Sequence, residues 1–222
     1  MNSQDTFYTT LDANEHFRGG LGSGVTNVGD SAWSSFNSYY PFIPCGVTKE
    51  LGSNTGVIDV AYAANEFTTS AFTTHVPSYR GIENPFGHIW KWQDGYTKYG
   101  TDSTGNIYTC DDITKFSDSL TDANVPDGYV LRGTCGLTSG WFGDWVWDSN
   151  GDFVHKTFAS SESASPFHDY AYHLNTGNRA LISGGCANSG SQAGLFFWHT
   201  YYDPSIVSAL IGGRLCYTPS EN

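Results

Sequence analysis

The sequence has few charged side chains, and most of these are acidic. Asp, Glu, Lys and Arg make up 14% of the 222 residues, with 22 acidic against 10 basic, so the formal net charge is −12. So little positive charge argues against nucleic acid and anionic membrane surfaces as partners, because both carry phosphate. The simplest interpretation of the acidic excess is that its negative charge keeps the protein soluble.

Long apolar runs are also missing. No segment approaches the roughly 20 apolar residues of a membrane-spanning helix, so we expect no membrane insertion. The N-terminus, Met1–Asp5, has neither the basic nor the apolar region of a signal peptide. We therefore expect either that the protein is made and assembled in the cytoplasm, or that residue 1 lies inside a longer chain.

Cysteine is scarce and widely spaced. The five cysteines form no C-x-x-C pattern, so neither a zinc site nor a redox motif is expected, and an odd number cannot all pair within one chain: Cys45, Cys110, Cys135, Cys186 and Cys216. We expect buried free thiols, with a Cys110–Cys135 disulfide as the alternative.

Recognisable catalytic and cofactor motifs are absent. No serine lies in G-x-S-x-G, no H-E-x-x-H occurs, and the glycine cluster of residues 19–24 fits neither a dinucleotide fingerprint nor a P-loop. The acidic stretch 148–152 lacks the full ligand series of an EF-hand, which favours a plain turn. We expect no catalytic residue, no metal and no cofactor, and hence no enzyme.

What the sequence has in abundance is aromatic residues, at 16%, and glycine, with 26 residues. Abundant aromatics supply enough apolar area for an ordered core, which argues against disorder. A helical bundle would instead be rich in Ala, Leu, Glu and Lys. The composition predicts a compact, loop-rich β or α+β domain, and the length suits one core with a small attachment segment.

Alternating apolar residues predict several strands. Residues 57–62 and 89–92 are strand candidates, the second of them central in a sheet. Two hairpins are predicted, one joining 97–99 to 107–109 around residues 102–106, the other joining 145–147 to 153–155 around residues 148–152. Four tryptophans on these strands are expected in the core: Trp90, Trp92, Trp145 and Trp147.

The segment from Ser183 to Tyr217 mixes two kinds of position. Glycines and apolar residues form a framework, and short clusters of chemically unrelated residues lie between them. Such clusters on a rigid scaffold are typical of an adaptable binding surface. The clusters comprise Cys186, Ala187, His199, Thr200, Tyr201, Tyr202, Ile206, Val207, Ala209 and Leu210. Tyr201 and Tyr202 are the strongest candidates for contact, since tyrosine gives large amphipathic area at low entropic cost.

Two blocks of this sequence resemble one family. The segment 183–217 contains Gly-Gly, then Ala-Gly-Leu-Phe-Phe-Trp, and then Ile-Gly-Gly-Arg-Leu. This order of motifs resembles the variable region of proteins diversified by diversity-generating retroelements. Gly-His-Ile-Trp-Lys-Trp at 87–92 resembles the Gly-Asn-Val-Trp-Glu-Trp signature of C-type-lectin-fold proteins of the formylglycine-generating-enzyme type, and the larger block 79–95 is similar to bacteriophage members. In that family, diversified asparagine codons mutate at adenines and cannot yield Met, Trp, Gln, Lys or Glu; none of these occurs at the ten cluster positions.

The resemblance implies an α+β, C-type-lectin-like fold, loop-rich with short antiparallel strands and few helices. We expect an irregular N-terminal attachment segment over 1–44 and a ligand-binding domain over 45–222. The implied function is receptor binding and host attachment by a phage tail or head fibre, or another protein of the virion surface. The partner would be a host cell-surface protein or glycan, and the assembly a homotrimer or other cyclic oligomer. The alternatives are a structural virion protein, or an oxidoreductase of the formylglycine-generating type acting through paired cysteines.

Overall fold

The computed structural model describes residues 46–63, 71–147, 153–166, 168–186, 189, 192–206, 208 and 210–213. Within these ranges the chain is mostly β-sheet, with short 3₁₀ helices η2 (Val47–Leu51), η3 (Ile113–Lys115) and η4 (Glu162–Ala164). The expected loop-rich, strand-dominated architecture is confirmed at this level. The expected segment 1–44 lies outside the described residues, as do Ala187, Val207 and Ala209 of the expected site.

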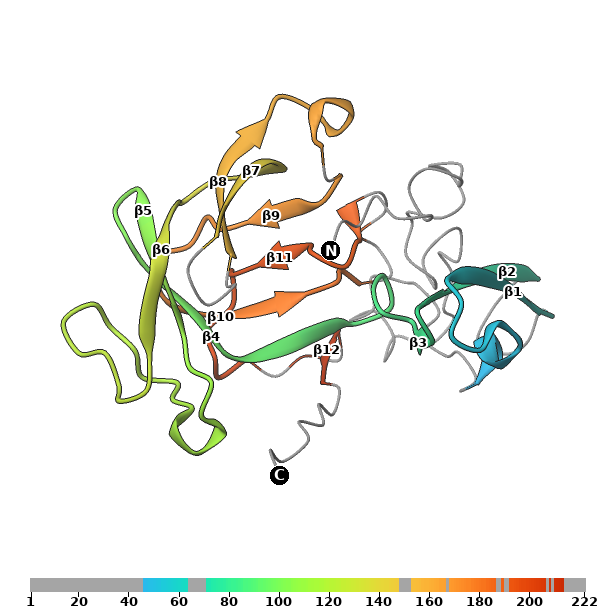
Figure 1. Ribbon diagram of the computed structural model, residues 1–222, viewed down its shortest axis with the longest axis horizontal. Helices are drawn as coiled ribbons and strands as arrows, with labels where there is room; N and C mark the ends of the chain where they lie inside the picture. The colour runs from blue at the N-terminus through green and yellow to red at the C-terminus, as the bar shows by residue number, and fades with distance from the viewer. Residues whose placement is uncertain are drawn as a thin grey trace.

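The strands form two sheets (Figure 1). The smaller sheet has the antiparallel order β1-β2-β3, and the larger has the order β6-β5-β4-β10-β11-β9-β7-β8, with β12 paired in parallel to β4. The strands are β1 (Gly56–Tyr62), β2 (Phe72–Tyr79), β3 (Ile82–Glu83), β4 (Trp90–Thr101), β5 (Thr104–Thr109), β6 (Val130–Gly136), β7 (Ser139–Trp147), β8 (Phe153–Ala159), β9 (Tyr170–Tyr172), β10 (Gly177–Ser183), β11 (Trp198–His199) and β12 (Ile211–Gly212).

The predicted strands and hairpins are found. The segment 57–62 lies in β1, and 89–92 leads into β4, which is central because β5 and β10 flank it. In the first hairpin Thr101 faces Thr104, so the turn is shorter than the predicted loop 102–106. Asp102 adopts a left-handed φ of 49°, which Asp tolerates better than most residues. In the second hairpin Trp147 faces Phe153 across the predicted turn, whose residues lie outside the described ranges.

The larger sheet curls until its two end strands meet. Val154 of β8 packs with Ile107 of β5 and Cys135 of β6. Gly133 of β6 eases this approach, because a Cβ there would make a tight contact of 3.3 Å with the Val154 side chain. The curl therefore encloses an inner face, filled by a second cluster in which Tyr96 also takes part: Phe142, Ala171, Leu181 and Trp198.

Alternation along the strands builds a separate core on the outer face. Leu181 faces inward, whereas its neighbour Ile182 packs outward with Trp90, Phe197 and Cys186. Trp90 is only 6% exposed, as predicted, and Trp92 is half-buried against the same cluster. Nothing is described of the side chains of Trp145 and Trp147.

A buried lysine on the inner face forms hydrogen bonds to the segment between β9 and β10. Lys98 is fully buried and its ammonium donates to the carbonyl oxygens of His173 at 2.9 Å and Asn175 at 2.7 Å. Burial lowers the pKa of Lys98 to about 8. Gly105 on β5 provides the space for the Lys98 side chain, since a Cβ at this position would lie 2.8 Å from it. These bonds fix the chain between β9 and β10.

The smaller sheet is joined to the start of the 183–217 segment. Tyr79 and Phe86 pack against Ala193 in one buried cluster, and the Gly87 amide donates to the Gly184 carbonyl at 2.9 Å. Gly184 has a φ of 92°, which glycine adopts readily. The beginning of that segment is thus held from both sheets.

Candidate functional site

The predicted contact residues 199–202 begin at the last residue of β11 and continue just beyond this strand. β11 runs antiparallel to β10 and parallel to β9, so that His199 faces Ile182 on one side and Tyr172 on the other. The Thr200 amide extends the pairing by donating to the Tyr172 carbonyl at 2.9 Å. Because alternate side chains of an extended segment point to opposite faces, His199 and Tyr201 point outward and Thr200 points inward.

The outward side chains join an aromatic cluster. His199 stacks on Tyr172 with ring centroids 4.9 Å apart and planes 10° apart, and on Tyr202 at 5.4 Å and 25°. Trp90 lies 4.9 Å from the same imidazole, and Tyr201 contacts both Tyr172 and Tyr202 edge-on. We call this cluster the aromatic face: Trp90, Tyr170, Tyr172, Phe197, His199, Tyr201 and Tyr202.

The aromatic face is open to solvent at the end formed by the predicted residues. Tyr201 is 40% exposed and Ile206 is 37% exposed, while Tyr202 and Leu210 are half-buried beside them. A turn presents Ile206, whose amide donates to the Asp203 carbonyl at 3.1 Å. The Asp203 carboxylate accepts from the amide and the hydroxyl of Ser205 at 3.0 and 2.7 Å, and these bonds lower its pKa.

Burial keeps the aromatic face uncharged. It lowers the pKa of His199 to about 4, because the imidazolium loses its hydration. The buried Nδ1 of His199 has no hydrogen-bond partner among the described residues. Burial likewise raises the pKa of the Tyr202 hydroxyl. The face therefore offers neutral rings and hydroxyl groups at neutral pH.

Two predicted contact residues are buried. The Thr200 side chain is 0% exposed, and its hydroxyl lies 2.7 Å from Nδ1 of His173 on the inner face. Cys186 is 3% exposed and packs beneath Trp90; its amide donates to the Ser189 hydroxyl at 3.0 Å. Both residues support the aromatic face from below and present no surface to a ligand.

The described cysteines are free and buried. The alternative of a Cys110–Cys135 disulfide is therefore wrong, and the expectation of buried thiols is confirmed for Cys110, Cys135 and Cys186. Burial raises the pKa of the Cys135 thiol to about 11, so this thiol stays protonated and a poor nucleophile.

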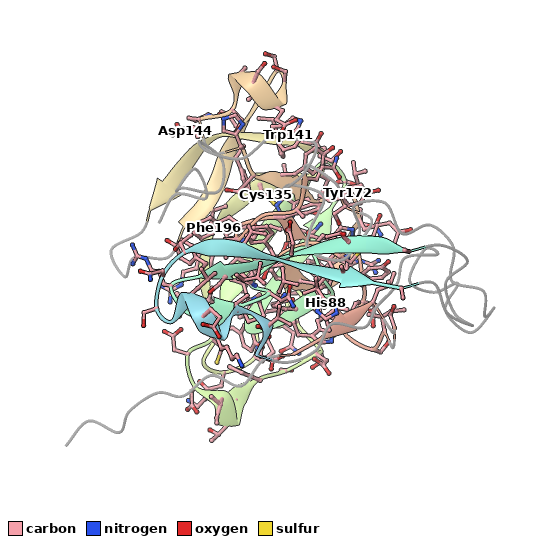
Figure 2. All side chains as sticks on the ribbon, turned by 90° about the vertical axis from the view of Figure 1, so that its right-hand side faces the viewer. His88, Cys135, Trp141, Asp144, Tyr172 and Phe196 are labelled. Carbon is pink, nitrogen blue, oxygen red and sulfur yellow. The ribbon has the colours of Figure 1, made fainter. Side chains whose placement is uncertain are left out.

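Sequence reasoning missed Tyr170 and Tyr172. Both lie on β9, outside the 183–217 segment, and both contact its aromatic residues directly. The signal was the alternation Tyr170-Ala171-Tyr172, which places two rings on one face and a small residue on the other. In Figure 2 the inner-face residue Phe196 is labelled to the left of the centre and Tyr172 to the right of it.

The described residues contain no group of three or more His, Cys, Asp or Glu side chains placed to hold a metal ion. Among the same residues, no helix has the length and apolarity needed to cross a membrane. A comparison with protein-family models, curated proteins and solved structures gave no match to this chain.

Proposed function

We propose that the protein binds a ligand through the aromatic face and carries out no reaction. The observation that carries this proposal is the exposed Tyr201, which follows the paired strand β11 by two residues and makes edge-on contacts with Tyr172 and Tyr202. Tyrosine and tryptophan dominate binding surfaces because they bury large areas with few rotatable bonds. The contact residues are those at the open end of the face: His199, Tyr201, Tyr202, Ile206 and Leu210.

The finer proposal is a C-type-lectin-like receptor-binding protein of the retroelement-diversified type. The division between a buried framework and an exposed set of residues supports it. Phe197 and Trp198 are 3% and 5% exposed, whereas Tyr201 and Ile206 are open to solvent. Changes at the exposed positions would alter the surface without disturbing the core.

In this proposal the protein acts on the surface of a phage virion and recognises a protein or glycan of the host cell. Each aromatic face is small, so one copy would bind weakly. Linking several copies raises the overall affinity without new contacts. A cyclic homo-oligomer, such as a trimer, fits this need.

The test compares two exposed-residue variants in a cell-binding assay. In the first, Tyr201→Ser and Ile206→Ser are combined on the aromatic face. In the control, Leu131→Ser replaces a side chain that is 53% exposed on β6, away from this face. The cells are bacteria that the native protein binds. The affinity of the first variant for these cells should be at least about tenfold lower than that of the native protein, equivalent to about 1.4 kcal/mol.

The control variant should bind as the native protein does, and light scattering should show the same assembly for all three proteins. Undiminished binding by a correctly assembled double variant would contradict the proposal. A structural virion protein with no receptor role would then be the better description.

A further inference from the structure

A wide bulge interrupts the pairing of β4 and β10, where residues 93–96 of β4 lie opposite Leu181 alone. Just before the bulge Lys91 faces Ser183, so Gln93, two residues further along β4, lies on the same face of the sheet as Ser183. Nε2 of Gln93 donates to the Ser183 hydroxyl at 2.7 Å. A bulge re-aims side chains and often borders a functional site, and this polar pair lies directly beside it.

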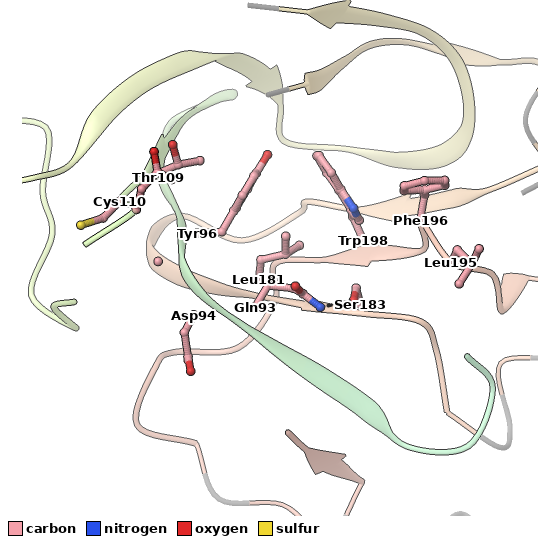
Figure 3. Close-up of a pocket in the computed structure, with 12 residues that line it drawn as sticks. Gln93, Asp94, Tyr96, Thr109, Cys110, Leu181, Ser183, Leu195, Phe196 and Trp198 are labelled. Carbon is pink, nitrogen blue, oxygen red and sulfur yellow. Dashed lines mark hydrogen bonds between the residues drawn. The ribbon is translucent and has the colours of Figure 1, made fainter. Parts of the chain in front are cut away.

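The Gln93–Ser183 pair lines a cavity of about 370 Å³ on the inner face (Figure 3). This volume falls within the range of small-molecule sites, which combine a mostly apolar lining with a few placed polar groups. Apolar and aromatic side chains supply that kind of lining here: Tyr96, Leu181, Leu195, Phe196 and Trp198.

The Gln93–Ser183 pair has one donor and one acceptor left for a ligand. The Ser183 hydroxyl accepts from Gln93, and neither its hydrogen nor Oε1 of Gln93 bonds to another described residue. The reverse orientation of the amide would also leave one donor and one acceptor, an amide N–H and a lone pair of the hydroxyl. Ser183 is 7% exposed, so bulk water reaches its hydroxyl poorly. A ligand that supplies both missing partners is therefore favoured.

A charged ligand does not suit this cavity. Its lining contains no lysine, arginine or histidine to pair with an anion. Of its two carboxylates, Asp94 points away from the Gln93 amide and from the rings (Figure 3), and Asp111 is 87% exposed and lies 3.9 Å from Nη2 of Arg132. An ion among the rings would lose its hydration without meeting an opposite charge, at a high cost in free energy. The ligand that fits is uncharged.

We propose that this cavity binds an uncharged amide that carries an apolar group. The ligand's carbonyl oxygen accepts from the Ser183 hydroxyl, and its N–H donates to Oε1 of Gln93. The apolar group packs against Leu181, Phe196 and Trp198. An amide presents a donor and an acceptor side by side, as the pair requires. The site lies on the face opposite to the aromatic face, and the proposal does not depend on the proposed function.

The first experiment titrates the ¹⁵N-labelled protein with benzamide and, separately, with acetophenone, which has the same ring and carbonyl but no N–H. We expect benzamide to shift the amide resonances of Gly95 and Ser183, and acetophenone to bind at least about tenfold more weakly, because it leaves the acceptor of the pair without a partner. Benzoate and benzylammonium should also bind at least about tenfold more weakly. Equal binding of acetophenone, tighter binding of either ion, or shifts confined to the aromatic face would overturn the proposal.

Three variants locate the binding. Gln93→Met removes the amide from an exposed side chain of similar length and should weaken benzamide binding about tenfold. Gln192→Met makes the same change at a residue that does not line the cavity, and should leave binding unchanged. Asp94→Asn removes the carboxylate that points away and should also leave it unchanged. The ¹⁵N spectra of the free variants report whether each is folded. Unaffected binding by a folded Gln93→Met, or an equal loss in either of the other two, would contradict the proposed site.

Two further titrations distinguish the sources of the amide. N-acetylglucosamine represents an acetamido sugar, with glucose as the counterpart that lacks the amide, and Nα-acetyl-phenylalanine amide represents a peptide. Binding of either one with loss in Gln93→Met supports the proposal and names the source. Binding of benzamide alone, with the same loss, supports a small free amide as the ligand.

Discussion

At the residue scale, neighbouring side chains after β11 have different roles because they lie on opposite faces. Thr200 is buried on the inner face, where its hydroxyl contacts His173, whereas Tyr201 is 40% exposed on the outer face. A buried polar pair stabilises the fold as long as both partners are present. An exposed ring contributes little to folding, which leaves it available for binding.

This division predicts different stabilities for two variants. Thr200→Val keeps the shape of the side chain but removes the hydroxyl next to His173, and should cost about 1–3 kcal/mol of unfolding free energy. Tyr201→Ala should change that free energy by about 0.5 kcal/mol or less. Urea unfolding of both variants measures the difference. Equal losses would contradict the assignment of one residue to the core and the other to the surface.

His199 predicts a pH dependence of stability. Its pKa is about 4 in the folded protein against 6.5 in an unfolded chain, so between these values the unfolded state binds the extra proton. Stability from this residue is therefore complete above about pH 6.5 and falls as the pH drops towards 4, by up to about 3 kcal/mol.

His199→Phe retains a ring in the stack and removes the titrating group. The unfolding free energy of this variant should fall less steeply than that of the native protein between about pH 6.5 and pH 4.5. Denaturant titrations at several pH values measure both slopes. Because the other histidines are the same in the two proteins, identical slopes would show that His199 does not titrate in this way.

At the scale of elements, one residue permits the bulge in β4, where residues 93–96 lie opposite Leu181 of β10 alone. Gly95 has a left-handed φ, and a Cβ there would overlap the Cys110 carbonyl and lie 2.7 Å from the Phe116 ring. Both the backbone conformation and the space exclude a larger residue. Residues 93–96 of the bulge and Leu181 opposite them line a cavity of about 370 Å³ on the inner face (Figure 3).

Gly95→Ala should therefore destabilise the protein by at least about 2 kcal/mol, combining backbone strain with overpacking. Gly136→Ala is the control, since a Cβ at Gly136 would meet only Thr138, at an ordinary 3.6 Å. Thermal unfolding should show a clear drop in Tm for the first variant and little change for the second. A Tm near the native value for Gly95→Ala would mean that the bulge relaxes at little cost.

At the scale of the whole molecule, a net charge of −12 sets the electrostatics. Like charges on a folded surface repel one another and reduce stability. The described ion pairs offset little of this; the shortest, Lys115 to Asp127 at 2.8 Å, involves an aspartate that is 87% exposed. The outer aromatic face carries no charge of its own, so ligand binding there should depend little on salt.

Added salt should stabilise the native protein. Raising NaCl from about 10 mM to about 150 mM shortens the screening length from about 30 Å to about 8 Å, which relieves the repulsion. A gain of about 1 kcal/mol would raise the Tm by about 2–4 °C for a chain of this size. Calorimetry with NaCl and with KCl tests this, and the two salts should act alike. A lower Tm at higher salt would show that attractive pairs outweigh the repulsion.

Local patterns in the sequence determined the β-rich class and several of the strands. Period-2 alternation marked β1 and the start of β4, and the turn residues marked both hairpins, because these features depend on neighbours within a few positions. The burial of Trp90 was predicted from the same local alternation.

Only the tertiary structure decided which distant strands lie side by side. β11 has two residues and pairs with β9, so that His199 meets Tyr172, which no short pattern specifies. The burial of Thr200 against His173 and the bulge opposite Leu181 depend on the same long-range pairing. Sheet register is set by packing across the whole core, so these features arise when the curled sheet forms and not from any one segment.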